Sequence, residues 1–537
     1  MSKLLLLGDE AIAQGALDAG FSGVYAYPGT PSTEITEYLQ RSAEAREKKL
    51  HTDWSANEKT AMEAALGMSY AGKRSMVCMK HVGLNVAADA FINSAMTGIN
   101  GGLLVVVADD PSMHSSQNEQ DSRFYGKFAM VPVLEPSDQQ EAYDLTYYAF
   151  QLSEKFRLPV LLRITTRLAH SRSGVVQKEK LPENKLSLPV DLNQFILLPA
   201  FARKRYKNLI SQQSELEQES HKSGNNRIEQ GQNKKTGIIA CGLAYNYYKE
   251  LAIREQLNYP ILKIAQYPLR AEAVSDFVDT VEEVLLLEEG YPLVEESLMG
   301  MLPGKYIIKG RLDGTLPRDG ELNPNLVEAA LGFGKTKAPA VPDIVVNRPP
   351  ALCNGCSHID MYNALNEAVA AYGRGRVFSD IGCYTLGALS PYNAINSCVD
   401  MGASIPMAKG AADAGLSPAV AVIGDSTFTH SGMTGLLDAV VESSPITVII
   451  SDNSTTGMTG GQKSHATNRL VNICRGLGVE EAHLRLINPL RKHHDENRKT
   501  ILEELEYNGV SVIIAERECI QTASKNKKMD KQKVFKN

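Results

Sequence analysis

Two apolar runs in the C-terminal third are each followed by side chains that could bind a metal ion. The pair Gly424-Asp425 comes directly after the run 419–423, and Asn453 comes shortly after the run 446–450. Both runs are typical of buried parallel strands, whose carboxyl ends meet at one edge of a sheet, so we expect the two side chains to lie side by side. With the backbone carbonyl of Thr455 they offer hard oxygen ligands, which suit Mg²⁺ bound together with a diphosphate.

The stretch that contains these residues, 424–462, resembles the thiamine diphosphate motif, which begins with Gly-Asp and closes on an Asn after a helix and a strand. Ser426 stands where Gly is commonest in the motif, and Asp452-Asn453 replaces a paired Asn. The glycine-rich turns leave backbone N–H groups available for phosphate oxygens. The residues that we expect at the cofactor are Gly424, Asp425, Ser426, Asn453, Thr455, Gly457 and Thr459, with Gly382 and Tyr384 from an earlier turn, and Asp425, Asn453 and the Thr455 carbonyl would hold Mg²⁺.

Four cysteines can meet at this same edge. Cys353 and Cys356 form a C-x-x-C turn, which alone could bind zinc, act as a redox pair, hold half of an iron–sulfur cluster or be simply two cysteines. Cys383 and Cys519 each follow a predicted strand, so both can converge on that turn. Four thiolates fit one [4Fe–4S] cluster, with Cys474 as the rival for the fourth ligand.

Glu58 begins a predicted Ala-rich helix, and taken alone it is an ordinary first-turn glutamate favoured by the helix dipole. The segments around it resemble the 2-oxoacid:ferredoxin oxidoreductases, and most closely the α subunits of indolepyruvate ferredoxin oxidoreductases. The segments that carry this resemblance are Tyr27–Ser32, Asn57-Glu58, Met79–Asp89 and Asp109–Arg123.

The resemblance implies roles for individual residues. Glu58 would contact the aminopyrimidine ring of thiamine diphosphate and promote deprotonation of the thiazolium carbon. Thr30 would lie near the substrate carboxylate or ketone, and the further site candidates are Lys80, His81 and Arg123. The four cysteines would ligate the cluster nearest thiamine, as they do in the pyruvate-type enzymes.

Alternating strands and helices predict an α/β fold with parallel sheets. The resemblance divides the chain into a pyrimidine-type thiamine domain, a transketolase-C-terminal-like domain and a diphosphate-type thiamine domain. Their predicted ranges are 1–175, 236–340 and 341–523, with a linker at 176–235 and a basic tail at 524–537. Within the linker, residues 211–235 are polar and predict a solvated linker or an exposed helix.

The composition is that of a soluble globular protein, with 43% hydrophobic and 22% charged residues among 537. A net charge of −6 gives no reason to expect nucleic acid, and no apolar stretch reaches membrane-spanning length. We expect a cytoplasmic protein, in which eight cysteines are metal ligands or buried thiols rather than disulfides. The expected buried thiols are Cys78, Cys241, Cys398 and Cys474.

The expected reaction is oxidative decarboxylation of an aryl 2-oxoacid, indolepyruvate first, with coenzyme A as acyl acceptor and ferredoxin as electron acceptor. The family implies a smaller β subunit and a dimer of heterodimers. Its α subunits commonly continue into a ferredoxin-like domain, whereas Cys519 is the last cysteine here, so we expect a separate ferredoxin or another subunit to continue the electron path. Two alternatives stay open: a non-redox thiamine decarboxylase whose C-x-x-C pair is structural or zinc-bound, and a non-catalytic assembly subunit.

Overall fold

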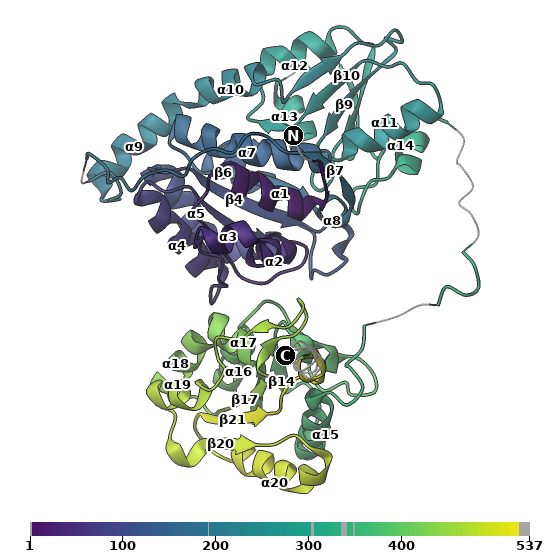
Figure 1. Cartoon of the computed structure of the whole chain (residues 1–537). Helices are drawn as coiled ribbons and strands as arrows, with labels where there is room; N and C mark the ends of the chain where they lie inside the picture. Colours follow the sequence, from purple (N-terminus) through teal and green to yellow (C-terminus); the bar gives the residue numbers. More distant parts are fainter. Residues whose placement is uncertain (1–2, 192, 302–305, 334–340, 347–349, 526–537) are drawn as a thin grey trace, which may run out of the picture. The chain divides into compact units, whose positions relative to one another are not determined.

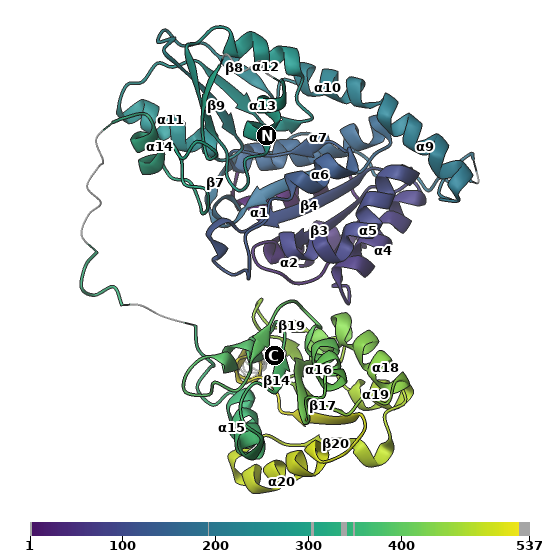
Figure 2. The ribbon, with the colours of Figure 1, turned by 180° about the vertical axis from the view of Figure 1, so that it is seen from behind.

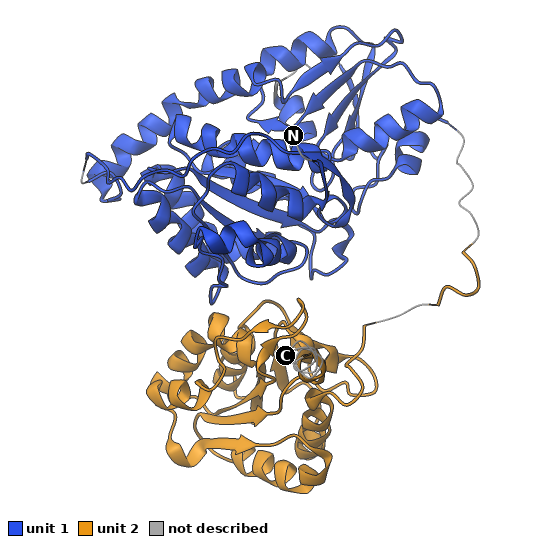
Figure 3. Cartoon of the chain, in the orientation of Figure 1, with its two compact units in different colours: residues 1–339 blue, residues 340–537 orange. Residues whose placement is uncertain are grey.

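The computed structural model describes residues 3–191, 193–301, 306–333, 341–346 and 350–525. The chain divides into two compact units, residues 1–339 and 340–537 (Figure 3). Both units are built from parallel sheets covered by helices, which confirms the predicted α/β class. Of the predicted basic tail, residues 526–537 lie outside the described part of the chain.

The first sheet of unit 1 has the strand order β11-β5-β6-β4-β3-β2. All its strands are parallel except β11, a two-residue strand that pairs antiparallel with β5. Helices α1 and α7 cover one face and α4 and α5 cover the other (Figures 1 and 2). The strands are β2 (Gly23–Ala26), β3 (Ser75–Lys80), β4 (Leu103–Asp109), β5 (Val133–Leu134), β6 (Val160–Thr165) and β11 (Gln266–Tyr267), and the helices are α1 (Gly8–Asp18), α2 (Thr33–Arg41), α4 (Glu58–Tyr70), α5 (His81–Thr97), α6 (Arg123–Ala129), α7 (Gln139–Phe156) and α8 (Thr166–His170).

A separate antiparallel pair joins the two ends of this first layer, because β1 (Lys3–Leu7) pairs with β7 (Arg172–Val176). The segment predicted as a linker or exposed helix contains part of α9 (Pro199–Ser211) and all of α10 (Gln213–Lys222). Helix α10 is not fully solvated, since Leu216 and Ser220 on one of its faces are buried. A mostly polar segment can therefore form a helix that packs on the protein surface through one or two buried residues.

The second sheet of unit 1 has the order β13-β12-β9-β10-β8, with only β8 antiparallel to its neighbour. Its strands β9 and β12 are almost wholly buried, as expected for parallel strands covered by helices on both faces. Its strands are β8 (Arg227–Glu229), β9 (Thr236–Cys241), β10 (Ile261–Ile264), β12 (Glu283–Leu287) and β13 (Ile307–Lys309), and its helices are α11 (Ala244–Arg254), α12 (Ala271–Val278), α13 (Leu293–Met301) and α14 (Pro324–Ala330).

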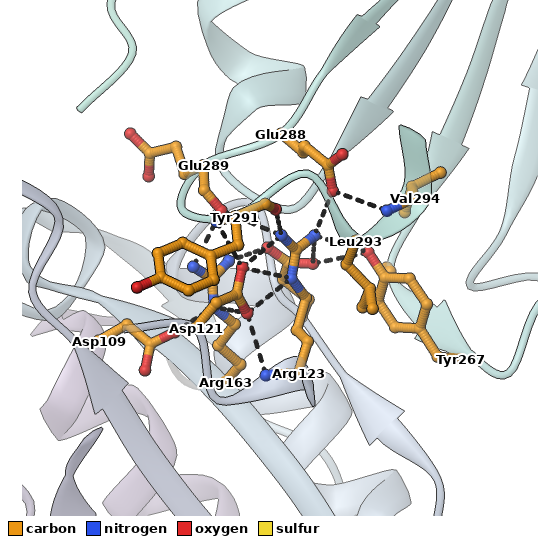
Figure 4. Close-up of polar contacts among 12 residues, drawn as sticks. Asp109, Asp121, Arg123, Arg163, Tyr267, Glu288, Glu289, Tyr291, Leu293 and Val294 are labelled. Carbon is orange, nitrogen blue, oxygen red and sulfur yellow. Dashed lines mark hydrogen bonds and ion pairs between the residues drawn. The ribbon is translucent and has the colours of Figure 1, made fainter. Parts of the chain in front are cut away.

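Buried charges hold the two sheets of unit 1 together (Figure 4). Arg123 and Arg163, both with no exposed side-chain surface, meet Asp121 from the first layer, and Arg123 Nη1 lies 3.0 Å from Glu288 Oε2 of the second. Arg163 Nη2 also donates to the Glu289 carbonyl at 3.0 Å. Ion pairs that are removed from water stay strong only when every partner is in place, so this network fixes one packing of the two layers.

Unit 2 contains one six-stranded parallel sheet, in the order β15-β14-β16-β17-β21-β20. Alternate residues of its central strands point to opposite faces, so the sheet has two cores. Ala421, Ile423 and Ile450 pack under α16, α18 and α19, whereas Val422 and Ile449 pack under α15 and α20. The elements are β14 (Val377–Ser379), β15 (Ser397–Cys398), β16 (Ala419–Gly424), β17 (Ile446–Asp452), β20 (Leu484–Ile487), β21 (Ser511–Glu516), α15 (Ser357–Val369), α16 (Ser404–Asp413), α18 (Met433–Val441), α19 (Leu470–Gly476) and α20 (His494–Leu505).

Among the helices of the described residues, none is long and apolar enough to cross a membrane.

Candidate active site

The carboxyl edge of the unit 2 sheet brings Asp425 and Asn453 together. Strands β16 and β17 pair in parallel with Gly424 opposite Ser451, so the chain leaves both strands at the same level. Asp425 and Asn453 are 2% and 7% exposed. Thr455 N donates to Asn453 Oδ1 at 3.1 Å, which holds the amide oxygen at the edge beside the Thr455 backbone.

Among the described residues, no positively charged side chain pairs with the Asp425 carboxylate. Burial raises its pKa from 3.8 to about 7, and the neighbouring Asp452 adds to the rise, although hydrogen bonds from Ser464 and from the Ser426 and Asn453 backbones oppose it. Its Oδ2 atom is buried and has no hydrogen-bond partner among the described residues. A buried oxygen without a partner costs free energy, and a divalent cation bound to it would remove that cost. The donor set therefore fits Mg²⁺.

Side-chain hydrogen bonds connect the turn at Asp425 with the segment 455–463. Ser426 Oγ lies 2.8 Å from Thr456 Oγ1, and Thr455 Oγ1 donates to the Gln462 carbonyl at 2.9 Å. The first bond joins the Gly-Asp turn to the hairpin of β18 (Thr455–Thr456) and β19 (Gln462–Lys463), and the second links the two strands of that hairpin. Thr459 Oγ1 donates to the Gln462 side chain at 2.5 Å, so the predicted residue Thr459 lies in the loop of the hairpin.

Tyr384 lies under the Gly-Asp turn. A Cβ atom at Gly424 would be 2.5 Å from the Tyr384 ring, and one at Gly382 would be 2.2 Å from it. Both positions need glycine because the ring occupies that space, and the Tyr384 hydroxyl bonds Asp380. The buried Tyr384 ring therefore packs against the backbone of the turn that contains Asp425.

The structure brings the four predicted cluster ligands together. Burial and the neighbouring thiols of Cys356, Cys519 and Cys353 raise the pKa of Cys383 to about 12, and Asp425 adds to the rise. The amide of Cys519 donates to the Asn453 carbonyl at 3.1 Å. Four acidic groups that oppose one another's ionisation fit a site in which iron supplies the compensating positive charge.

Cys383 also lies against the diphosphate turn. A Cβ atom at Gly457 would be 3.0 Å from Cys383 Sγ and 3.9 Å from Asn453 Nδ2. One of the predicted cluster ligands and one of the predicted Mg²⁺ ligands therefore both lie beside Gly457 within unit 2.

The remaining cysteines differ in exposure. Cys78, Cys241 and Cys474 are buried, as predicted. Cys474, on the buried face of α19, belongs to the core, where burial raises its pKa to about 12, and the four-thiol group contains Cys519 in its place. The prediction that Cys398 is buried is wrong, because it lies exposed at the end of the edge strand β15.

In unit 1, Glu58 is the first residue of α4, and Asn57 caps that helix by accepting from Thr60 N at 2.8 Å. Glu58 is only 5% exposed, and its carboxylate lies against α5, where a Cβ atom at Gly83 would be 2.6 Å from Glu58 Oε1. Burial lowers the pKa of Lys80, while Asp110 and Glu58 raise it. The Glu58 carboxylate and the Lys80 ammonium therefore lie close enough to interact.

The loops around Glu58 contain two other predicted residues. Lys80 Nζ donates to the Ser115 carbonyl at 3.1 Å, and Ser115 Oγ donates to the Thr30 carbonyl at 3.3 Å. The turn that carries Thr30 therefore contacts the same segment as Lys80. His81 is 1% exposed, its Nε2 lies 3.2 Å from the Asn118 side chain, and its Nδ1 has no hydrogen-bond partner among the described residues.

Arg123 does not face this group. Its side chain is fully buried in the ion-pair network, where its nitrogens contact Asp121, Tyr267 and Glu288 and the carbonyls of Glu289 and Tyr291 (Figure 4). These partners take up the five N–H donors of a guanidinium group. The structure gives Arg123 a role in packing two layers, and we do not propose it as a substrate ligand.

One residue near the metal ligands was missed as part of this site. His358, in the first turn of α15, is 2% exposed, and burial lowers its pKa to about 4. Its Nε2 lies 3.5 Å from Asn453 Nδ2. The neutral imidazole therefore orients Asn453, and its position two residues after the C-x-x-C pair was the signal available in the sequence.

Comparison with known proteins gives a thiamine-enzyme match in each of the two units. Residues 14–196 match the family described as pyruvate flavodoxin/ferredoxin oxidoreductase, thiamine diphosphate-binding. Residues 380–515 match the C-terminal thiamine pyrophosphate-binding domain of thiamine pyrophosphate enzymes. The first match contains Glu58 and the second contains Asp425 and Asn453.

Full-length relatives identify the family. The indolepyruvate oxidoreductase subunit IorA of Archaeoglobus fulgidus is 41% identical over 554 residues, covering 96% of this chain and 86% of the relative. The IorA subunit of Methanothermobacter thermautotrophicus is 38% identical over 545 residues, covering 96% of this chain and 87% of the relative. The fold resembles that of a 2-oxoglutarate:ferredoxin oxidoreductase from Magnetococcus marinus, with a TM-score of 0.51 and 18% identity over 62% of this chain and 65% of that one. The chain belongs to the IorA family, the thiamine diphosphate-dependent subunits of indolepyruvate oxidoreductases.

Proposed function

We propose that this subunit catalyses the oxidative decarboxylation of an aryl 2-oxoacid, indolepyruvate first, to CO₂ and an acyl-coenzyme A, with electrons leaving through one [4Fe–4S] cluster. The observation that carries the proposal is the contact between two ligand sets on one sheet edge: the thiol of Cys383 lies beside Gly457 and beside the carboxylate of Asp425. The names of the relatives support the choice of indolepyruvate.

The residues of unit 2 bind the cofactor and its ion. Asp425, Asn453 and the Thr455 carbonyl would hold Mg²⁺, and the backbone of the turns at Ser426, Gly457 and Thr459 would bind the diphosphate. When bound, thiamine diphosphate supplies the carbanion chemistry that cleaves the bond between the carboxyl and carbonyl carbons. Tyr384 and His358 keep the ligands in position.

The residues of unit 1 act on the pyrimidine and on the substrate. Glu58, which lies against the backbone of Gly83, would bind the pyrimidine ring nitrogen and would exchange a proton with it. Lys80, close to Glu58, offers an N–H donor to a substrate oxyanion or carboxylate. Thr30 and His81 border the same loops and are the further candidates for contacts with the substrate.

The electrons and the partners follow from the family. Cys353, Cys356, Cys383 and Cys519 would hold the cluster, and Cys353 is exposed, so an external ferredoxin can approach it. We propose a smaller β subunit in a dimer of heterodimers and a cytoplasmic location, which suits the free cysteines of the chain.

The test is anaerobic reduction of a viologen dye by the purified subunit with its β partner, with indolepyruvate, phenylpyruvate and pyruvate as substrates and with or without coenzyme A. We expect reduction that needs coenzyme A and is fastest with indolepyruvate, together with one cluster's worth of iron and acid-labile sulfide. Thiamine-dependent CO₂ release without iron and without dye reduction would instead identify a non-redox decarboxylase. A chain that does not bind thiamine diphosphate with Mg²⁺ would be an assembly subunit.

A further inference from the structure

Three helices of unit 1 bring together one buried carboxylate, a second carboxylate and an imidazole. Asp9 lies at the start of α1, Glu34 in the first turn of α2 and His170 at the end of α8. One ligand atom from each side chain lies within 4.8 Å of the other two. The proposed thiamine and iron–sulfur ligands do not include any of these residues.

Asp9 points into this group without a partner. It is 0% exposed, and neither of its carboxylate oxygens has a hydrogen-bond partner among the described residues. Burial raises its pKa well above the ordinary value, and the carboxylates of Glu34 and Glu10 raise it further. Arg172 Nη2 lies 3.9 Å from Glu10 Oε1, so this cation faces Glu10. A buried carboxylate among other carboxylates is costly unless a cation binds there.

The Glu34–His170 pair has the spacing of two ligands of one ion. His170 Nε2 lies 3.6 Å from Glu34 Oε2, which is beyond a normal hydrogen bond. Around a tetrahedral zinc ion, bonds of about 2.0–2.2 Å to nitrogen and oxygen place adjacent ligand atoms roughly 3.3–3.5 Å apart. The observed separation needs only a small closure to reach that geometry.

We propose that Asp9, Glu34 and His170 form a binding site for a divalent transition ion of the zinc class. One imidazole and two carboxylates suit such an ion better than Mg²⁺, which prefers oxygen ligands and retains its water. The charge of the ion compensates Asp9, and its bonds join α1, α2 and α8. Helix α2 begins directly after the turn that carries Thr30, so the ion would hold that turn against the first layer of unit 1.

The test uses the full chain with its cofactors, dialysed anaerobically against ZnCl₂ in the presence of excess Mg²⁺, followed by elemental analysis of zinc and iron. The wild type should retain one more equivalent of zinc than Asp9→Asn and His170→Ala, at equal iron content. Glu37→Gln is the matched control, because Glu37 lies on the same helix α2, one turn after Glu34, and is not part of the three-residue group. The control should bind zinc as the wild type does.

A second measurement separates binding from folding. Zinc should raise the melting temperature of the wild type and of Glu37→Gln, and should leave that of Asp9→Asn and His170→Ala unchanged. His170 is partly exposed, with 36% of its side chain accessible, so its replacement does not disturb the core. Equal zinc content in all four proteins, or no zinc-dependent stabilisation of the wild type, would overturn the proposal and leave Asp9 as a buried neutral carboxyl.

Discussion

Asp425→Asn should have opposite effects on the protein without thiamine diphosphate and Mg²⁺ and on the loaded protein. Without the ion, the buried Asp425 carboxylate lacks a cation and lies close to Asp452. An asparagine has nearly the same shape but carries no charge. We therefore expect the substitution to stabilise ion-free unit 2 and to abolish binding of thiamine diphosphate with Mg²⁺.

The size of the effect follows from the pKa of Asp425, which is about 7 in the folded protein against an ordinary value of 3.8. A carboxyl whose pKa rises on folding binds its proton more tightly in the native state, so stability falls as the pH rises from 3.8 to 7 and the loss is complete above 7. The difference between the two pKa values corresponds to about 4 kcal/mol. After subtracting about 1 kcal/mol for a weakened hydrogen bond, Asp425→Asn should gain about 3 kcal/mol at pH 8. The gain should vanish near pH 4.

The assay is urea denaturation of the stripped protein at several pH values, followed by two signals. Trp54 is the only tryptophan of the chain and packs against the core of unit 1, so its fluorescence reports that unit. Far-ultraviolet circular dichroism reports both units. The substitution should shift the unfolding transition of unit 2, which only circular dichroism detects, and should leave the Trp54 transition of unit 1 unchanged. Asp438→Asn, an exposed acid on α18 of the same unit, is the control and should shift neither.

Two results would refute this reasoning. If Asp425→Asn is less stable than the wild type at pH 8, the carboxylate already has a favourable partner and needs no ion. If the variant binds thiamine diphosphate and Mg²⁺ as tightly as the wild type, Asp425 is not a ligand. With cofactor at about 1,000 times its Kd the wild type should be the more stable protein, since the bound ligand then contributes about 4.1 kcal/mol, more than the gain expected for Asp425→Asn.

Three further experiments, with four substitutions, test the other proposed roles. Glu58→Gln should lower turnover about 10²- to 10⁴-fold and leave the Kd of thiamine diphosphate nearly unchanged, as measured by viologen reduction and cofactor titration; unchanged turnover would contradict its role in proton transfer. Cys519→Ser should lose the iron of the cluster while Cys474→Ser retains it, and the reverse pattern in iron analysis would assign Cys474 as the ligand. Arg123→Met leaves buried carboxylates unpaired and should destabilise unit 1 by about 3–5 kcal/mol in Trp54-monitored denaturation, whereas a selective loss of turnover in a stable protein would return Arg123 to the substrate site.

The strands that carry the cofactor ligands could be predicted because the signal is local. The runs before Asp425 and Asn453 are apolar on both faces, as expected for strands covered by helices on both sides. Turn residues follow each run directly. The end of each strand, and the side chains just beyond it, could therefore be predicted from a few neighbouring residues. The helix that begins at Glu58 was predicted from its local Ala-rich composition, and the structure adds Asn57 as its N-cap.

Long-range pairing was not predictable in this way. Strand β11 has only two residues and crosses from the second layer of unit 1 to pair with β5 of the first. Nothing in its composition marks it as a strand. Arg123 illustrates the same limit: it is polar and lies within a family-like segment, but its partner Glu288 is far away in the sequence. Cys398 was wrongly assigned to the interior because small neighbours do not distinguish a core position from an edge strand.

The arrangement of unit 2 explains how the proposed chemistry and the proposed electron exit can be coupled. The backbone of Cys519 bonds that of Asn453, and Cys383 lies against Gly457. One proposed cluster ligand is thus joined to a proposed Mg²⁺ ligand, and another to the diphosphate turn. The separation between cofactor and cluster is then determined within residues 340–537, by strands that share a single hydrogen-bonded sheet. Because that sheet has a packed core on each face, the separation has little freedom to change, which is what rapid electron transfer from the same intermediate in every turnover requires.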